Sequence, residues 1–145
     1  MRITLDTNVL TGGHDGASGE ARQILLRILR GGHRLVLSQS ILYELEEVLH
    51  YPRIKNLYRL TDAQIRRYVD LLAGIAELVD LGQPVTLPLT DRDDWPVLRT
   101  AIEGCVDVLC SNDGGFHKDI AIAFCAQFEI QVMKSAELLR FLKQQ

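Results

Sequence analysis

Short apolar segments with the pattern of β-strands alternate along this chain with segments that have the apolar spacing of amphipathic helices. The expected strands are residues 1–5, 34–38, 75–81, 106–110 and 129–133. The expected helices are residues 17–32, 40–50, 95–104 and 135–145, with a further helix that begins at Thr61 or Asp62. Strands that alternate with helices of this length form βαβ units. The sequence therefore predicts an α/β fold with a central, mainly parallel five-stranded sheet.

The first of these helices has the clearest apolar face. Ile24, Leu25, Ile28 and Leu29 recur at helical spacing. Gly31 and Gly32 follow, and glycine is a usual signal for the end of a helix.

The composition indicates a single domain that covers residues 1–145. Hydrophobic residues make up 47% of the chain and charged residues 24%, which is typical of a soluble globular domain. No apolar run approaches the roughly 20 residues of a membrane span, and the N-terminus lacks the apolar region of a secretory signal. We therefore expect a cytoplasmic protein that does not bind a membrane. The net charge of -3 disfavours strong generic attraction to a polyanion, but a local basic surface could still bind nucleic acid.

The three cysteines do not indicate a metal site or a disulfide framework. Cys105, Cys110 and Cys125 are odd in number, form no C-x-x-C pair and lie in otherwise apolar segments. We expect them to be reduced residues of the core.

Two carboxylates follow expected strands. Asp6 comes directly after the apolar alternation of "MRITL", and Asp113 follows the fourth strand in "CSND". Either residue could simply cap a helix or stabilise a turn. Ligands of open α/β sheets, however, bind outside the carboxyl ends of the strands. The two positions are therefore also candidates for catalysis or metal binding.

Further acidic residues lie at helix positions that could reach the same edge of the sheet. Glu44 is at the border of its helix's apolar face, although Glu46 is placed about equally well and a solvated acidic face is an equal alternative. Three aspartates crowd the start of the helix at residues 95–104, where one would suffice as a cap: Asp91, Asp93 and Asp94.

Four carboxylates gathered at one sheet edge would repel one another strongly unless they were protonated or neutralised. A divalent ion with hard oxygen ligands, Mg²⁺ or Mn²⁺, is the usual remedy, and such sites hydrolyse phosphodiester bonds. Asp107 does not fit this group, because an extended segment would place it roughly 20 Å from Asp113.

Four acidic motifs follow one another along the chain: "DTNVL" at 6–10, "ILYELEEVL" at 41–49, "DRDDWPVLRTAI" at 91–102 and "VDVLCSND" at 106–113. In this order, they resemble the motifs of the PIN-domain ribonucleases, and in particular those of the VapC-like toxins of toxin-antitoxin systems. The resemblance implies a three-layer α/β/α fold in which the first and fourth strands are neighbours. It also implies an acidic, catalytic metal-binding set formed by Asp6, Glu44, Asp94 and Asp113.

The same resemblance assigns supporting roles and partners. Asn8 would assist the acidic set, and Ser111 would hold the fourth-strand acid in place through its hydroxyl. Asp91 and Asp93 compete with Asp94 for the third position, and the resemblance gives no role to His117 or Asp119. The implied cofactor is Mg²⁺ or Mn²⁺, the implied substrate is RNA, and the implied partners are a small antitoxin protein and a second copy of the chain.

Two other functions are compatible with the sequence. A receiver-like signalling domain would use Asp80 as phosphoacceptor, with Ser111 and Lys134 at the ends of the two following strands. It would, however, require a second acid beside Asp6 and would leave the acids at 91–94 unused. A PIN fold that only binds proteins is the other alternative, although the intact acidic set argues against it. A phosphatase of the Asp-x-Asp type is disfavoured because Asn8 occupies the second acidic position.

Overall fold

A computed structural model of the chain describes residues 1–14, 16, 17, 19–83, 87 and 94–145. Five parallel strands form one sheet in the order β3-β2-β1-β4-β5. The strands are β1 (Arg2–Leu5), β2 (Arg34–Ser38), β3 (Glu77–Val79), β4 (Val108–Cys110) and β5 (Gln131–Met133). All five lie within the predicted segments, which confirms the predicted α/β class.

The predicted helices are also present, with ends that differ by a few residues from those expected. Thr61 is the N-cap of α5, and Gln64 completes a capping box, so the helix begins where the sequence indicated. The helices are α1 (Thr7–Leu10), α2 (Glu20–Arg30), α3 (Gln39–Leu49), α4 (Pro52–Tyr58), α5 (Asp62–Ile75), α6 (Trp95–Glu103), α7 (Asp119–Ala126), α8 (Ser135–Lys143) and the 3₁₀ turn η2 (Gly114–His117). Of these, α1, α4, α7 and η2 were not predicted. The Pro-bearing segment "LGQPVTLPLTDRDD" at residues 81–94, where the sequence predicts a loop, falls largely outside the described residues.

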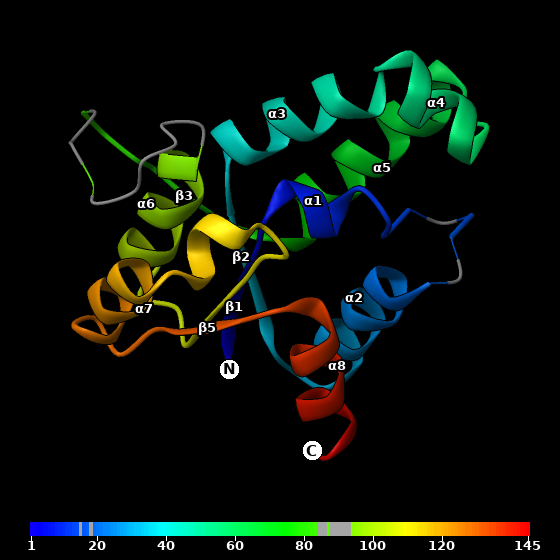
Figure 1. Cartoon of the computed structure of the whole chain (residues 1–145). Coiled ribbons are helices and arrows are strands. Elements are labelled where there is room, and N and C mark those ends of the chain that lie inside the picture. Colours follow the sequence, from blue (N-terminus) through cyan, green and yellow to red (C-terminus); the bar gives the residue numbers. More distant parts are fainter. Residues whose placement is uncertain (15, 18, 84–86, 88–93) are drawn as a thin grey trace.

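The elements form three layers. Helices α2 and α8 pack together on one side of the sheet, while α6 and α7 lie on the other (Figure 1). Helix α6 covers β1, β2 and β4, and α7 packs against β5. Helix α3 leaves the carboxyl end of β2 and packs against α5 and α1 above the sheet edge (Figure 1). The described part of the chain contains no helix that is long and apolar enough to cross a membrane.

The buried residues largely match the apolar pattern of the sequence. Ile24, Leu25 and Ile28 of α2 are buried, whereas Leu29 is 44% exposed. Leu29 lies at the edge of the helical stripe, where the curved surface of the helix turns back to solvent.

Only two of the cysteines belong to the core. Burial raises the pKa of Cys110 to about 12, with the negative charge of Asp6 as a further cause, and burial raises that of Cys125 to about 11. Both thiols are therefore protonated at neutral pH. Cys105 is exposed, and its prediction as a core residue is wrong. It occupies a left-handed turn (φ 49°) directly after Gly104 ends α6, outside the regular elements that carry the core.

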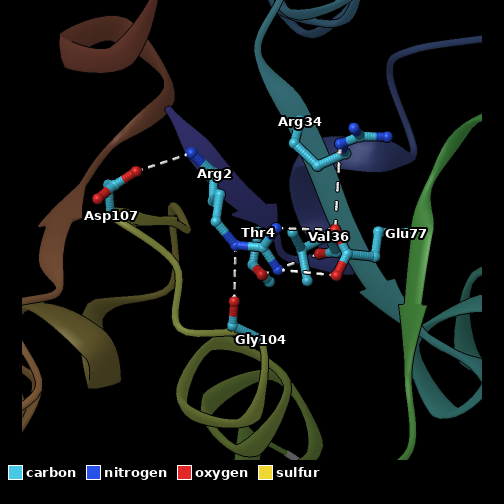
Figure 2. Close-up of polar contacts among 7 residues, drawn as sticks. All are labelled: Arg2, Thr4, Arg34, Val36, Glu77, Gly104 and Asp107. Atoms are coloured by element: carbon cyan, nitrogen blue, oxygen red, sulfur yellow. Dashed lines mark hydrogen bonds and ion pairs between the residues drawn. The ribbon is translucent and has the colours of Figure 1, made fainter.

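A network around Arg2 ties the amino ends of the strands together (Figure 2). The Arg2 guanidinium donates two hydrogen bonds to the Glu77 carboxylate, at 2.8 and 3.0 Å, and a third to the carbonyl oxygen of Gly104 at 2.9 Å. The Arg2 backbone N–H donates to Asp107 Oδ2 at 2.8 Å. Asp107 is thus engaged at the end of the sheet opposite Asp6, as its exclusion from the acidic group predicted.

Candidate active site

The strand order places a topological switch point between β1 and β4. From β1 the chain winds through β2 and β3 in one direction, and then β4 and β5 continue on the other side of β1. Ligands of open α/β sheets bind at such a switch point, between the two strands where the winding direction reverses. Leu5 pairs with Cys110 in this ladder, and the Asp6 N–H donates to the Cys110 carbonyl oxygen at 2.9 Å. Asp6 and Ser111 therefore leave the sheet side by side.

Asp6 combines a structural and a chemical role. Its Oδ1 accepts a hydrogen bond from the Thr7 N–H at 2.7 Å and so caps α1. Its Oδ2 accepts from Ser111 Oγ at 2.7 Å and from Asn8 Nδ2 at 3.3 Å. The residue is only 6% exposed. A residue that only caps a helix does not need to be this deeply buried. It also does not need hydrogen bonds from two further side chains, here those of Asn8 and Ser111.

The pKa of Asp6 is raised, first by burial and then by the negative charge of Asp113, against the opposing hydrogen bonds from Ser111 and Thr7. The folded protein therefore holds this proton more tightly than the unfolded chain does. The free energy of unfolding accordingly falls as the pH rises from the pKa of Asp6 in the unfolded chain through its higher pKa in the folded protein. At neutral pH the full loss of stability from this ionised carboxylate is present.

We therefore expect metal-free Asp6→Asn to be more stable than wild type at neutral pH, because the amide carries no charge and still caps the helix. The difference should shrink as the pH falls through the pKa of Asp6. Urea unfolding of both proteins at several pH values, in the presence of a chelator, measures this. A variant that is less stable by the same amount at every pH would contradict it.

Asp113 is held by the segment that follows β4. Its N–H donates to Ser111 Oγ at 3.0 Å, and its Oδ1 accepts from the Gly115 N–H at 3.0 Å. His117 Nε2 lies 2.7 Å from the Ser111 carbonyl oxygen, and since a carbonyl oxygen only accepts, this nitrogen carries the proton. The Ser111 hydroxyl thus connects the Asp6 carboxylate to the backbone N–H of Asp113, and His117 forms a hydrogen bond to the backbone carbonyl of Ser111. Asp119 is exposed in the first turn of α7.

Asp94 approaches the same segment from α6. It occupies the N-cap position and is 9% exposed, but its side chain makes no capping hydrogen bond. A Cβ atom added to Gly115 would lie 3.4 Å from Asp94 Oδ2 and 3.5 Å from Asp113 Oδ1, so both carboxylates face this glycine. The absence of a side chain at Gly115 leaves room for them. Asp91 and Asp93, the competing candidates, lie outside the described residues.

The three glutamates of α3 differ in their surroundings. Glu46 lies 3.4 Å from Arg66 of α5 in an ion pair, and Glu47 accepts from the Tyr51 hydroxyl at 3.2 Å. Glu47 is exposed, whereas Glu46 is half-buried. Glu44 is half-buried, and α3 packs against α1, the helix that Asp6 caps.

A divalent cation fits the chemistry of this edge. The side chains that meet there offer carboxylate, hydroxyl and amide oxygens, which are the ligands Mg²⁺ and Mn²⁺ prefer. The pKa of Asp6 is raised by burial and, to a smaller extent, by the negative charge of Asp113. Within the described residues, however, no three Asp, Glu, His or Cys side chains are already arranged to hold a metal ion.

The strand order rules against the receiver-like alternative. A receiver needs its phosphoacceptor beside the strands that carry the hydroxyl and the lysine, as in the order 2-1-3-4-5. Here β3 is an edge strand, and β2 and β1 separate it from β4, which places Asp80 roughly 14 Å from Ser111. Asp80 accepts a hydrogen bond from the Gly82 N–H at 3.0 Å and so forms a local turn.

Three polar residues beside the site were not predicted from the sequence. Asn112 lies between Ser111 and Asp113, and its N–H donates to Asn8 Oδ1 at 3.3 Å. Its side chain bonds to Ser135, the first residue of α8, whose hydroxyl donates to Glu20, the first residue of α2. The motif "CSND" contained the signal for Asn112, whereas Ser135 and Glu20 carry no local signal.

Comparison with known proteins agrees with this geometry. A family model described as PIN domain matches residues 2–114. Among solved structures, a chain in the crystal structure of VapBC2 from Rickettsia felis, bound to a DNA fragment from their promoter, superposes with a TM-score of 0.59. The two chains are 14% identical, and the alignment covers 92% of this chain and 98% of that chain, which is a likeness of fold. No curated protein matches the sequence.

Proposed function

This chain belongs to the PIN domain family, and from that premise we propose that it is a metal-dependent endoribonuclease that hydrolyses phosphodiester bonds of RNA. The observation that carries the proposal is the buried carboxylate of Asp6 at the switch point, joined to Asp113 through Ser111. A fold that needed only a helix cap would gain nothing from this second acid beside it.

The residues have distinct roles in this proposal. Asp6, Glu44, Asp94 and Asp113 hold Mg²⁺ or Mn²⁺, with Asp91 or Asp93 as replacements for Asp94. A divalent ion supplies positive charge to the phosphate oxygens and favours ionisation of the attacking water. Ser111 and Asn8 donate to Asp6 Oδ2 and fix the orientation of its carboxylate, while the Gly115 N–H does the same for Asp113. Ser111 also sets the spacing of the two acids, because it bonds to both residues.

We further propose that the protein is the toxin of a toxin-antitoxin pair. The support is the likeness of its fold to a chain of the VapBC2 structure, together with the acidic motifs of the sequence. The proposal includes a small antitoxin protein encoded beside this gene, a homodimer, a single domain over residues 1–145 and a location in the cytoplasm. Identifying the neighbouring gene and co-purifying its product with this chain tests the antitoxin directly.

Purified protein should cleave single-stranded RNA internally in the presence of Mg²⁺ or Mn²⁺, and excess EDTA should stop the reaction. The reason is that the site offers carboxylate, hydroxyl and amide oxygens, which are ligands of hard divalent cations. Gel analysis of an end-labelled RNA measures this, with activity restored by excess Mn²⁺ as the control. Cleavage that persists in EDTA would contradict the mechanism, and no cleavage with either metal would favour a protein-binding role.

A further inference from the structure

A groove of about 430 Å³ opens directly beside the proposed active site. We propose that it is a subsite for one nucleobase of the RNA, next to the bond that is cut, and that Glu20 makes it selective for guanine. The inference rests on the proposed function and adds the identity of a preferred nucleotide. The volume falls within the range of small-ligand sites and is sufficient for a nucleotide.

The groove and the acidic site share a wall. Asn8 lines the groove, and its Nδ2 donates to Asp6 Oδ2 at 3.3 Å. Asn112 also lines it and lies between Ser111 and Asp113 in the chain. A nucleotide bound in the groove would therefore place its own phosphate, or that of its neighbour, at the carboxylates.

The polar wall of the groove is held in place before any ligand binds. The Ser135 N–H donates to Asn112 Oδ1 at 3.0 Å, and Asn112 Nδ2 lies 3.0 Å from the Ser135 hydroxyl. This hydroxyl also donates to Glu20 Oε1. Glu20 is exposed in the first turn of α2, where the helix dipole favours a carboxylate. Glu20 thus lines the groove with one carboxylate oxygen held by Ser135, and the carboxylate has further acceptor capacity for a ligand.

The lining of the groove also includes the apolar side chains of Val48 and Ile54 and the aromatic ring of Tyr58. The His14 ring meets the Tyr58 ring edge-on, with centroids 4.9 Å apart, which limits rotation of the tyrosine. A base ring can pack against such an aromatic platform whatever its sequence identity. The groove thus combines an aromatic ring for the face of a base with polar groups for its edge.

The carboxylate of Glu20 determines which of the four bases has a hydrogen-bonding edge that fits the groove. An ionised carboxylate only accepts hydrogen bonds, and its two oxygens match two adjacent donors. Guanine presents two adjacent donors, N1–H and the N2 amino group. Adenine and cytosine present one amino donor beside a ring nitrogen acceptor, and uracil presents one N–H between two carbonyl groups. Only guanine satisfies both oxygens without placing an acceptor against a negative charge.

Two measurements test this inference. The first is titration of the protein with GMP, AMP, CMP and UMP, followed by NMR shifts, which does not depend on catalysis. GMP should bind roughly tenfold more tightly than the others, and Glu20→Gln should remove this preference. Tyr58→Leu should weaken all four alike, because the platform does not distinguish bases. Glu103→Gln is the matched control, since Glu103 is exposed at the far end of α6 and should leave the preference unchanged.

The second measurement is cleavage of four short RNAs that differ at one position. Wild type should prefer the RNA with guanine, and Glu20→Gln should cleave all four at similar rates. Equal binding of the four nucleotides, or no binding of GMP at millimolar concentration, would overturn the subsite and leave the nuclease proposal standing. Selective GMP binding without cleavage of any RNA would support the subsite and overturn the nuclease proposal instead.

Discussion

Asp6→Asn and Asp113→Asn should each lower RNA cleavage by at least about a hundredfold. Loss of a residue that merely orients a metal ligand commonly costs 10- to 100-fold, and loss of the ligand itself should cost at least as much. Asparagine keeps the size of the side chain and the capping oxygen of Asp6 but loses the charge that attracts a divalent cation. Initial rates on one RNA at saturating Mn²⁺ measure the effect.

The matched control is Asp80→Asn, which makes the same chemical change at an exposed turn far from the switch point. It should retain the activity of wild type. The same variants extend the test to cells, where expression of the wild-type gene should stop growth and the two site variants should be tolerated at equal protein level. Equal toxicity of wild type and both site variants would mean that the harm does not come from catalysis.

The strands were predictable because their signals are local. Period-two apolar alternation, as in "MRITL", or a short apolar run between polar residues, as in "RLVLS" before the helix at Gln39, is visible within a few positions. Of the order β3-β2-β1-β4-β5, only the contact between the first and fourth strands was predicted, and that prediction came from the family resemblance. Composition and periodicity do not determine which strands become neighbours.

The missed helices have separate physical reasons. Helix α1 is a single turn that starts directly after β1, too short to show a periodic pattern. Pro52 follows the predicted helix at residues 40–50, where a proline usually indicates the end of a helix, but it also occupies the first turn of α4, where its missing N–H costs nothing. Helix α7 is apolar on almost every side, with Ile120 and Ile122 exposed, so no stripe marked it as amphipathic.

Some residues of the candidate site were recognisable from the sequence, and others were not. Asp6 and Asp113 were recognisable because each follows a strand, and the sheet then determines that they meet. Glu20 and Ser135 were not recognisable, because their contact joins residues 115 positions apart through the packing of α2 against α8. Such a contact depends on how two helices pack on one face of the sheet, and the sequence of neither helix alone predicts it.

Binding of Mn²⁺ to the folded protein tests the central claim, that Asp6 is a metal ligand and not only a helix cap. A ligand that binds only the folded state stabilises it by RT ln(1 + [L]/Kd), which is about 2.7 kcal/mol at a hundredfold excess over Kd. For a chain of this size that corresponds to a rise in Tm of roughly 5 to 10 °C. Asp6→Asn lacks the charge that attracts the ion and should gain much less.

Thermal unfolding of wild type, Asp6→Asn and Asp80→Asn, each with EDTA and with millimolar Mn²⁺, provides this measurement. Wild type and Asp80→Asn should show the same large Mn²⁺-dependent rise in Tm, and Asp6→Asn should show little or none. Equal rises in all three proteins, or no rise in any of them, would contradict the account and leave Asp6 as the N-cap of α1.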